Sequence, residues 1–126
     1  MLTAGLIFAA LAAVLHVYIF VMESLTWTSP RTRATFGTTA EEAETTKLLA
    51  FNQGFYNLFL GLGVLVGVVG SWRGWDPQGS TLVVYGCLFM IGAALVLVVA
   101  RPAMARGAAI QGVLPVLALV AAWLLR

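Results

Sequence analysis

The residues best able to do chemistry lie in two short polar stretches within an otherwise apolar chain. His16 and Glu23 are seven residues apart near the end of the first apolar run. In an α-helix this spacing places both side chains on one face, about 10 Å apart along the axis. His16 could carry a proton near neutral pH, and Glu23 could supply a negative charge or take up a proton. The pair is therefore a candidate for handling protons inside a membrane.

The second polar stretch is NQGFYN at residues 52–57, and the last apolar run adds one further amide. The amides offer both donors and acceptors, and the tyrosine adds a hydroxyl group. Because lipid cannot solvate such groups, they must face one another or a cavity. The candidate ligand-binding or proton-handling residues are His16, Glu23, Asn52, Gln53, Tyr56, Asn57 and Gln111.

Each of these residues also has a simpler explanation. Glu23 could lie at the level of the lipid headgroups or pair with Lys47, and His16 could tie two helices together through Tyr56 or an amide. One histidine, one cysteine (Cys87) and one carboxylate do not reproduce a familiar metal-ligand spacing, so the sequence predicts neither a metal site nor a cofactor. A hydrolase triad, a phosphate loop and a dinucleotide turn are missing from the sequence.

The elements that must position these residues are membrane helices. Apolar residues make up 61% of the 126-residue chain and charged residues 10%, which is outside the usual range of soluble domains. Four runs approach the roughly 20 apolar residues that a spanning helix needs. We therefore expect an all-α, four-helix transmembrane bundle that forms one domain over residues 1–126, with helices at about residues 2–23, 40–72, 81–100 and 107–125.

The link between the first two helices is long and carries much of the charge. Thr39 and Glu42 match a capping box, which predicts that the second helix begins near Ala40 and projects beyond the bilayer. Residues 27–37, with Trp27 and Phe36, could lie against the headgroups as a cap and act as a lid over the polar site. A solvated loop is the alternative interpretation.

The seven basic residues are scattered at helix ends, which argues against nucleic acid as a partner and makes them topology signals. Five of them fall in the links between helices one and two and between helices three and four, and two fall at the opposite ends. This asymmetry predicts that both termini lie outside and both basic links in the cytoplasm, in a bacterial inner (plasma) membrane. Dual insertion is the alternative. The first group is Arg31, Arg33, Lys47, Arg101 and Arg106, and the second is Arg73 and Arg126.

Gly63 and Gly67 in the second helix form a small-xxx-small element that lets two helix backbones approach closely. Packing within the chain explains this element, and homodimerisation through the Gly63/Gly67 stripe is the bolder interpretation.

The motifs also resemble a known family. The run from His16 through Glu23 to Trp27, with Phe36-Gly37, Thr46-Lys47 and the NQGFYN stretch, closely resembles the DUF1304 family of small integral membrane proteins. The resemblance covers essentially the full length and implies a four-helix inner-membrane protein of about this size. It implies no activity.

These observations favour a membrane protein with a polar intramembrane pocket near the cytoplasmic side. Such a pocket could bind or transport a small molecule, with proton coupling through His16 and Glu23. Two alternatives stay open: an intramembrane enzyme acting on a lipid-soluble or headgroup-sized substrate, and a structural or assembly protein without a ligand.

Overall fold

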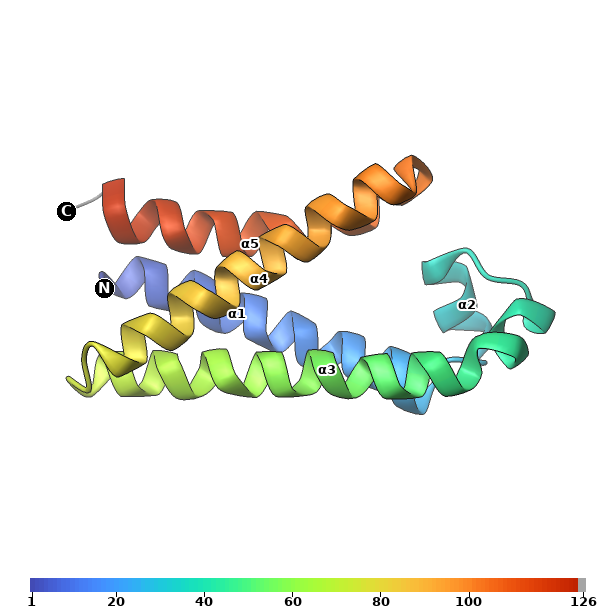
Figure 1. Ribbon diagram of the computed structural model, residues 1–126, viewed down its shortest axis with the longest axis horizontal. Helices are drawn as coiled ribbons and strands as arrows, with labels where there is room; N and C mark the ends of the chain where they lie inside the picture. The colour runs from blue at the N-terminus through green and yellow to red at the C-terminus, as the bar shows by residue number, and fades with distance from the viewer. Residues whose placement is uncertain (125–126) are drawn as a thin grey trace.

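The chain is helical almost throughout the part that the computed structural model describes, residues 1–124 (Figure 1). No strand occurs within these residues. In chain order the elements are α1 (Thr3–Phe20), a π-helical turn η1 (Val21–Leu25), α2 (Pro30–Phe36), α3 (Ala40–Trp72), α4 (Gln78–Ala100), a short 3-10 turn η2 (Pro102–Met104) and α5 (Ala105–Leu124).

Four segments are long and apolar enough to cross a membrane. The all-α, four-helix fold class is therefore confirmed, and so is a first link that is partly helical, because α2 forms there. The expected last helix included Leu125, which lies outside the described residues, as does the topology signal Arg126. The four segments are Thr3–Leu25, Ala40–Trp72, Gln78–Ala100 and Pro102–Trp123.

Local sequence signals explain where α2 and α3 begin. The predicted capping box of α3 is confirmed: the Glu42 backbone N–H donates to Thr39 Oγ1 at 3.1 Å, and the Thr39 backbone N–H donates to Glu42 Oε2 at 3.3 Å. The Ser29 hydroxyl caps α2 in the same manner, accepting from the Thr32 backbone N–H at 3.3 Å. Gly37 ends α2 with a φ of 67°, a left-handed conformation that glycine adopts without steric cost.

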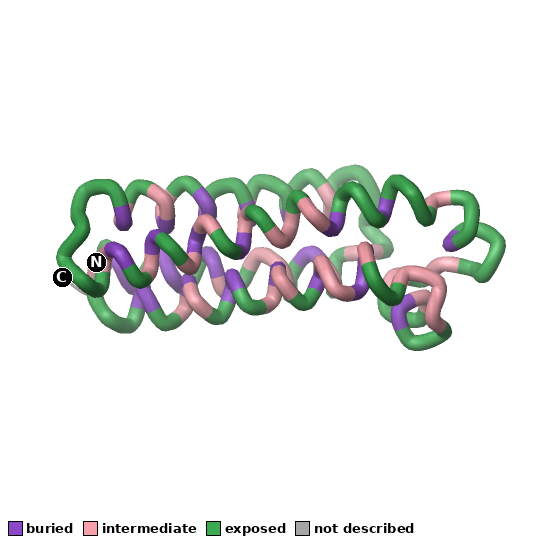
Figure 2. The backbone as a smooth tube through the Cα atoms, turned by 90° about the horizontal axis from the view of Figure 1, so that it is seen from below, coloured by how far each residue is buried: buried purple, intermediate pink, exposed green. Residues whose placement is uncertain are grey.

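The four long helices pack as a ring in the order α1, α3, α4, α5. Small residues bring the backbones close: a Cβ atom on Gly61 would lie 2.9 Å from the Ala13 carbonyl oxygen, and one on Gly67 would lie 2.8 Å from the Gly79 carbonyl oxygen. The buried residues follow the inside of the bundle (Figure 2). The main core cluster consists of Leu6, Ala9, Ala12, Ala13, Val64, Val83, Cys87, Met90, Ala118 and Leu119.

The bundle is open at one end. Towards the link that joins them, α4 and α5 diverge from α1 and α3, and α2 lies at this same end (Figure 1). The N-terminus, the end of α5 and the turn between α3 and α4 lie at the other end.

Candidate functional site

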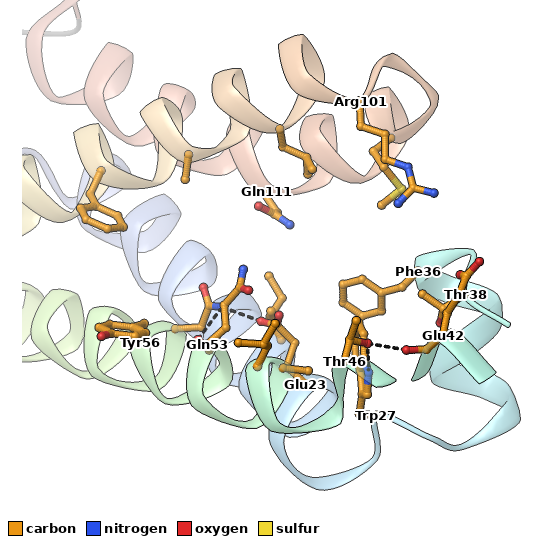
Figure 3. Close-up of a pocket in the computed structure, with 18 residues that line it drawn as sticks. Glu23, Trp27, Phe36, Thr38, Glu42, Thr46, Gln53, Tyr56, Arg101 and Gln111 are labelled. Carbon is orange, nitrogen blue, oxygen red and sulfur yellow. Dashed lines mark hydrogen bonds between the residues drawn. The ribbon is translucent and has the colours of Figure 1, made fainter. Parts of the chain in front are cut away.

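A cavity of about 840 Å³ occupies the open end of the bundle (Figure 3). Its walls come from all four long helices together with η1, η2 and the first link. The polar and charged residues among the described residues that line it are Glu23, Thr38, Glu42, Thr46, Gln53, Tyr56, Asn57, Arg101 and Gln111. Aromatic, aliphatic and sulfur-containing side chains complete the lining, namely Ile19, Trp27, Phe36, Leu49, Ala50, Phe89, Ala93, Leu97 and Met104.

Glu23 is the most enclosed charged residue of the cavity wall, with 6% of its surface exposed. The Asn57 side-chain amide donates to Glu23 Oε1 at 2.7 Å, and the same amide lies 3.4 Å from the Gln53 carbonyl oxygen. This contact joins η1 to α3 and fixes the carboxyl group at the cavity. The hydrogen bond engages one carboxyl oxygen, so the other is available to a ligand.

A π-helical turn sets the direction of the Glu23 side chain. The Thr26 backbone N–H donates to the Val21 carbonyl oxygen at 3.1 Å, a five-residue hydrogen bond that is wider than an α-helical one. Ser24 in this turn donates to the Phe51 carbonyl oxygen at 2.8 Å. Gly54 of α3 makes the approach feasible, because a Cβ atom at that position would collide with the Ser24 side chain. Close packing against α3 therefore holds the turn that carries Glu23.

Three further predicted residues lie at the cavity. Gln53 and Tyr56 line it from α3, and Gln111 points into it from α5 (Figure 3). Tyr56 and Phe89 of α4 are lining residues that are also 68% and 52% exposed. Both side chains therefore remain accessible where α3 and α4 border the cavity.

The predicted lid residues also lie at the cavity. The rings of Trp27 and Phe36 are 5.0 Å apart, and Phe36 points from α2 towards the cavity (Figure 3). Trp27 Nε1 donates to Thr46 Oγ1 at 3.1 Å, and Thr46 in turn donates to the Glu42 carbonyl oxygen at 2.7 Å. The hydrogen bond from Trp27 to Thr46 therefore attaches this part of the first link to α3 at one end of the cavity.

Sequence reasoning missed several lining residues. Arg101 lies at the end of α4 and was assigned only a topological role, while Glu42 was assigned only to the helix cap. Thr38 and Phe89 carried no recognisable signal. The Thr38 hydroxyl oxygen is buried without a hydrogen-bond partner in the described part of the chain. The available clue was the antiparallel arrangement of the helices, because it brings the charged residues of the first link and Arg101, which follows the third helix, to the same end of the bundle.

Two predicted residues do not line the cavity. His16 is 2% exposed, and its Nδ1 lies 2.8 Å from the Ala12 carbonyl oxygen one turn earlier in α1. His16 is about two turns from Glu23. Glu23 itself lies in the π-helical turn, which changes the rotation around the helix axis between the two side chains from the value that regular α-helical spacing gives. Asn52 is exposed and lies outside the lining. The polar residues of α3 are thus divided between the cavity and the outer surface.

The simpler explanations can be compared with these contacts. Glu23 is bonded to Asn57 and not to Lys47, and the His16 contact lies within its own helix and not with Tyr56. Over residues 1–124, no three histidine, cysteine, aspartate or glutamate side chains gather closely enough to hold a metal ion. The arrangement offers one enclosed carboxyl group, several amides and four aromatic rings for contact with an organic molecule.

An all-helical chain with four membrane-capable helices has the architecture of a small multi-pass membrane protein. The chain matches the family described as "Protein of unknown function (DUF1304)" over residues 10–123, nearly its whole length, and it belongs to that family. The resemblance of the motifs is thereby confirmed. Searches of curated proteins and of solved structures found no match.

Proposed function

We propose that this protein binds a small lipophilic molecule in the cavity between its two helix pairs. The observation that carries the proposal is the cavity itself, about 840 Å³ of space whose walls combine one enclosed carboxyl group, several amides and hydroxyl groups with aromatic and aliphatic side chains. Ligand sites commonly have volumes of roughly 300–1,000 Å³ and combine apolar walls with a few polar groups that orient the ligand.

The exposure of two lining side chains on neighbouring helices supports a ligand that arrives from the bilayer. Tyr56 and Phe89 are both exposed and both line the cavity, so an apolar molecule could reach it between α3 and α4 without crossing water. The cap formed by Trp27 and Phe36 covers the end of the cavity beside α2. A ligand seated there would place its apolar part against the helices and its polar part near Glu23.

Proton coupling and transport would each require a further property in addition to ligand binding in the cavity. Glu23 lines the cavity and could exchange a proton with a ligand, whereas His16 lies outside the lining. A transport pathway would need an exit through the other half of the bundle, where the core cluster packs tightly. We therefore propose binding as the function, with any proton exchange assigned to Glu23.

The enzyme alternative has less support from the described residues of the wall. These residues include carboxyl groups but no histidine, cysteine or serine that could act as a nucleophile or as a base beside them. A general acid or base must lie within hydrogen-bond reach of the reacting atoms, and a nucleophile is normally activated by an adjacent base. The structural alternative predicts that the cavity stays without a ligand, which the next experiment tests.

Filling the cavity should remove the ligand. Ala93 is small, exposed and part of the lining, so Ala93→Trp would occupy the cavity without disturbing the core. Val96→Trp on the same helix is the matched control, because Val96 is 69% exposed and lies outside the lining. Mass spectrometry of organic extracts from the purified proteins should detect a small molecule with the wild type and with Val96→Trp, and should find it depleted with Ala93→Trp.

Either of two results would contradict binding: no bound small molecule in the wild type, or equal amounts in both variants. Thermal unfolding in detergent provides the check that both variants are folded. Equal unfolding temperatures together with equal ligand content would favour the structural role.

We further propose that residues 1–126 form a single domain whose two termini lie outside the cell and whose α2 end faces the cytoplasm. Basic residues towards the α2 end support this orientation. They are Arg31 and Arg33 in α2, Lys47 near the beginning of α3, Arg101 just after α4, and Arg106 in the first turn of α5. A homodimer would have to pack on the open side of Gly63, because Gly67 already contacts α4.

A further inference from the structure

The charges and rings around the cavity favour one class of ligand. Resting on the proposed binding function, we infer that the cavity selects a lipophilic cation, a molecule with an apolar body and an amine or other positively charged centre. Three independent features of the lining support this inference: an enclosed carboxylate, a set of aromatic faces, and the balance of charge between the inner wall and the rim.

The enclosed carboxylate is Glu23, which has 6% of its surface exposed. Removing a carboxylate from water costs several kcal/mol unless hydrogen bonds and an opposite charge offset the loss. Asn57 supplies one neutral hydrogen bond at 2.7 Å, and that bond engages Oε1 alone. A cationic group in the cavity would supply the opposite charge to the second oxygen.

Aromatic rings form a large part of the remaining wall. The lining includes Trp27, Phe36, Tyr56 and Phe89, which come from the first link, α2, α3 and α4. The faces of aromatic rings attract cations, most strongly in the case of tryptophan. The Trp27 ring is held by its hydrogen bond to Thr46, so this side chain loses little freedom when a cation binds.

The distribution of charge around the cavity also favours a cation. Among the described residues of the lining, two carboxyl groups, those of Glu23 and Glu42, stand against one guanidinium group, that of Arg101. Figure 3 places Arg101 at the rim on the wall opposite Glu23, at the end of α4. An anion would therefore find its partner only at the rim, whereas a cation would find one beside the amides of the inner wall.

A pair of ions with matched size and opposite charge tests the inference. Tetraphenylphosphonium and tetraphenylborate have nearly the same shape and apolar surface, so a difference in their affinities reports charge selectivity. Binding to the purified full-length protein in an uncharged detergent can be measured by isothermal titration calorimetry. We expect the phosphonium ion to bind at least about tenfold more tightly than the borate ion.

Matched variants locate the selectivity in the cavity. Glu23→Gln keeps the shape of the side chain and should lower phosphonium affinity about tenfold or more, while the exposed Glu44→Gln should leave it within about twofold. Phe36→Leu should lower the affinity about threefold or more through the lost ring face, and Phe59→Leu, an exposed ring outside the lining, should not. If Glu23→Gln reduces the yield of folded protein, the comparison of Phe36→Leu with Phe59→Leu still tests whether the ion binds in the cavity.

The outcomes separate this inference from the proposed function. Equal or tighter borate binding that depends on Arg101 would overturn cation selectivity while leaving a working binding cavity. If neither ion binds, but a neutral molecule is recovered from the wild type and lost in Ala93→Trp, cation selectivity is also overturned and the binding function is retained. Phosphonium binding that is unchanged by both Glu23→Gln and Phe36→Leu would overturn the inference because the ion would then bind elsewhere.

Discussion

At the scale of single residues, the contact between Glu23 and Asn57 defines the cavity. It is a side-chain hydrogen bond of 2.7 Å between residues 34 positions apart in the sequence, and it joins η1 to α3. An enclosed carboxyl group that lacks a hydrogen-bond donor is costly. The amide of Asn57 therefore contributes to folding as well as to the shape of the site.

We predict that Asn57→Ala lowers the free energy of unfolding by about 1–3 kcal/mol, because Glu23 then lacks its donor. Asn52→Ala is the matched control on the same helix, and it should change the free energy by less than about 0.5 kcal/mol because Asn52 is exposed. Denaturation in mixed detergent micelles measures both values. Equal effects of the two substitutions would show that the Glu23 contact does not stabilise the fold.

The sequence predicts well which polar residues lie in the same region of the bundle. It predicts less well which of their side chains point into the cavity. Glu23, Gln53, Tyr56, Asn57 and Gln111 all line one cavity, as their positions along the helices suggested. His16 was expected on the same face as Glu23, because regular α-helical spacing was assumed. The π-helical turn breaks that regularity, and it depends on packing against a distant glycine that no local pattern reveals.

At the scale of helices, glycine spacing determines how closely the backbones approach. Gly67 of α3 faces α4, where a Cβ atom would lie 2.8 Å from the Gly79 carbonyl oxygen and 2.8 Å from the Leu82 Cβ atom. Gly63, one turn earlier, has no atom within 4 Å of the equivalent position. The two glycines of the small-xxx-small element therefore have different environments.

We predict that Gly67→Leu destabilises the protein by about 1–3 kcal/mol through overpacking, and that Gly63→Leu changes stability by no more than about 0.5 kcal/mol. Thermal unfolding in detergent compares the two variants. If a second copy packs on Gly63, Gly63→Leu should also lower the mass of the protein complex measured by light scattering. Equal destabilisation by both variants would contradict the assignment of Gly67 to the α3–α4 contact.

The beginning of α4 contains an acid-sensitive contact. Asp76 Oδ1 accepts from the Ser80 hydroxyl group and from the Ser80 backbone N–H, the latter at 3.3 Å. The hydrogen bond from the Ser80 hydroxyl is the main reason why the pKa of Asp76 is below its usual value of 3.8. Because the pKa is lower in the folded state, this contact stabilises the protein above pH 3.8, and its contribution is lost as the pH falls through the folded-state value.

We therefore predict that Asp76→Asn lowers the unfolding temperature at pH 7 and that its difference from the wild type shrinks as the pH falls below about 4. Glu44→Gln, at an exposed glutamate of α3, is the control and should show no comparable pH-dependent difference. Differential scanning fluorimetry in detergent over pH 3–7 provides the measurement. A difference that stays constant over this range would rule out the ionised Asp76 as its source.

At the scale of the whole molecule, the four-helix fold follows from the sequence because each membrane-capable segment is long and apolar by itself. The beginning of α3 was equally predictable, since the capping box of Thr39 and Glu42 is a local motif. The divergence of α4 and α5 was not, because it results from contacts between helices far apart in the sequence. The lining residues Phe89 and Arg101 were missed for this reason.

We predict the orientation from the basic residues at the α2 end. In a Cys87→Ala background, a cysteine introduced by Gln78→Cys should react with a membrane-impermeant maleimide in intact cells, and one introduced by Thr35→Cys should react only after permeabilisation. Both positions are exposed, so access to the thiol reports the side of the membrane. The reverse pattern would show inverted insertion, and partial labelling at both positions would show two orientations.

The π-helical turn of residues 21–25 has a consequence for how the chain can be altered. A turn of this kind holds one residue more than an α-helical turn, so it is equivalent to a single-residue insertion in an otherwise regular helix. Deleting Val21 should let α1 continue without the bulge while its earlier part stays fixed by the alanines of the core. The shortened chain should keep its helix content by circular dichroism yet lose phosphonium binding, which would separate the requirement for folding from the requirement for recognition.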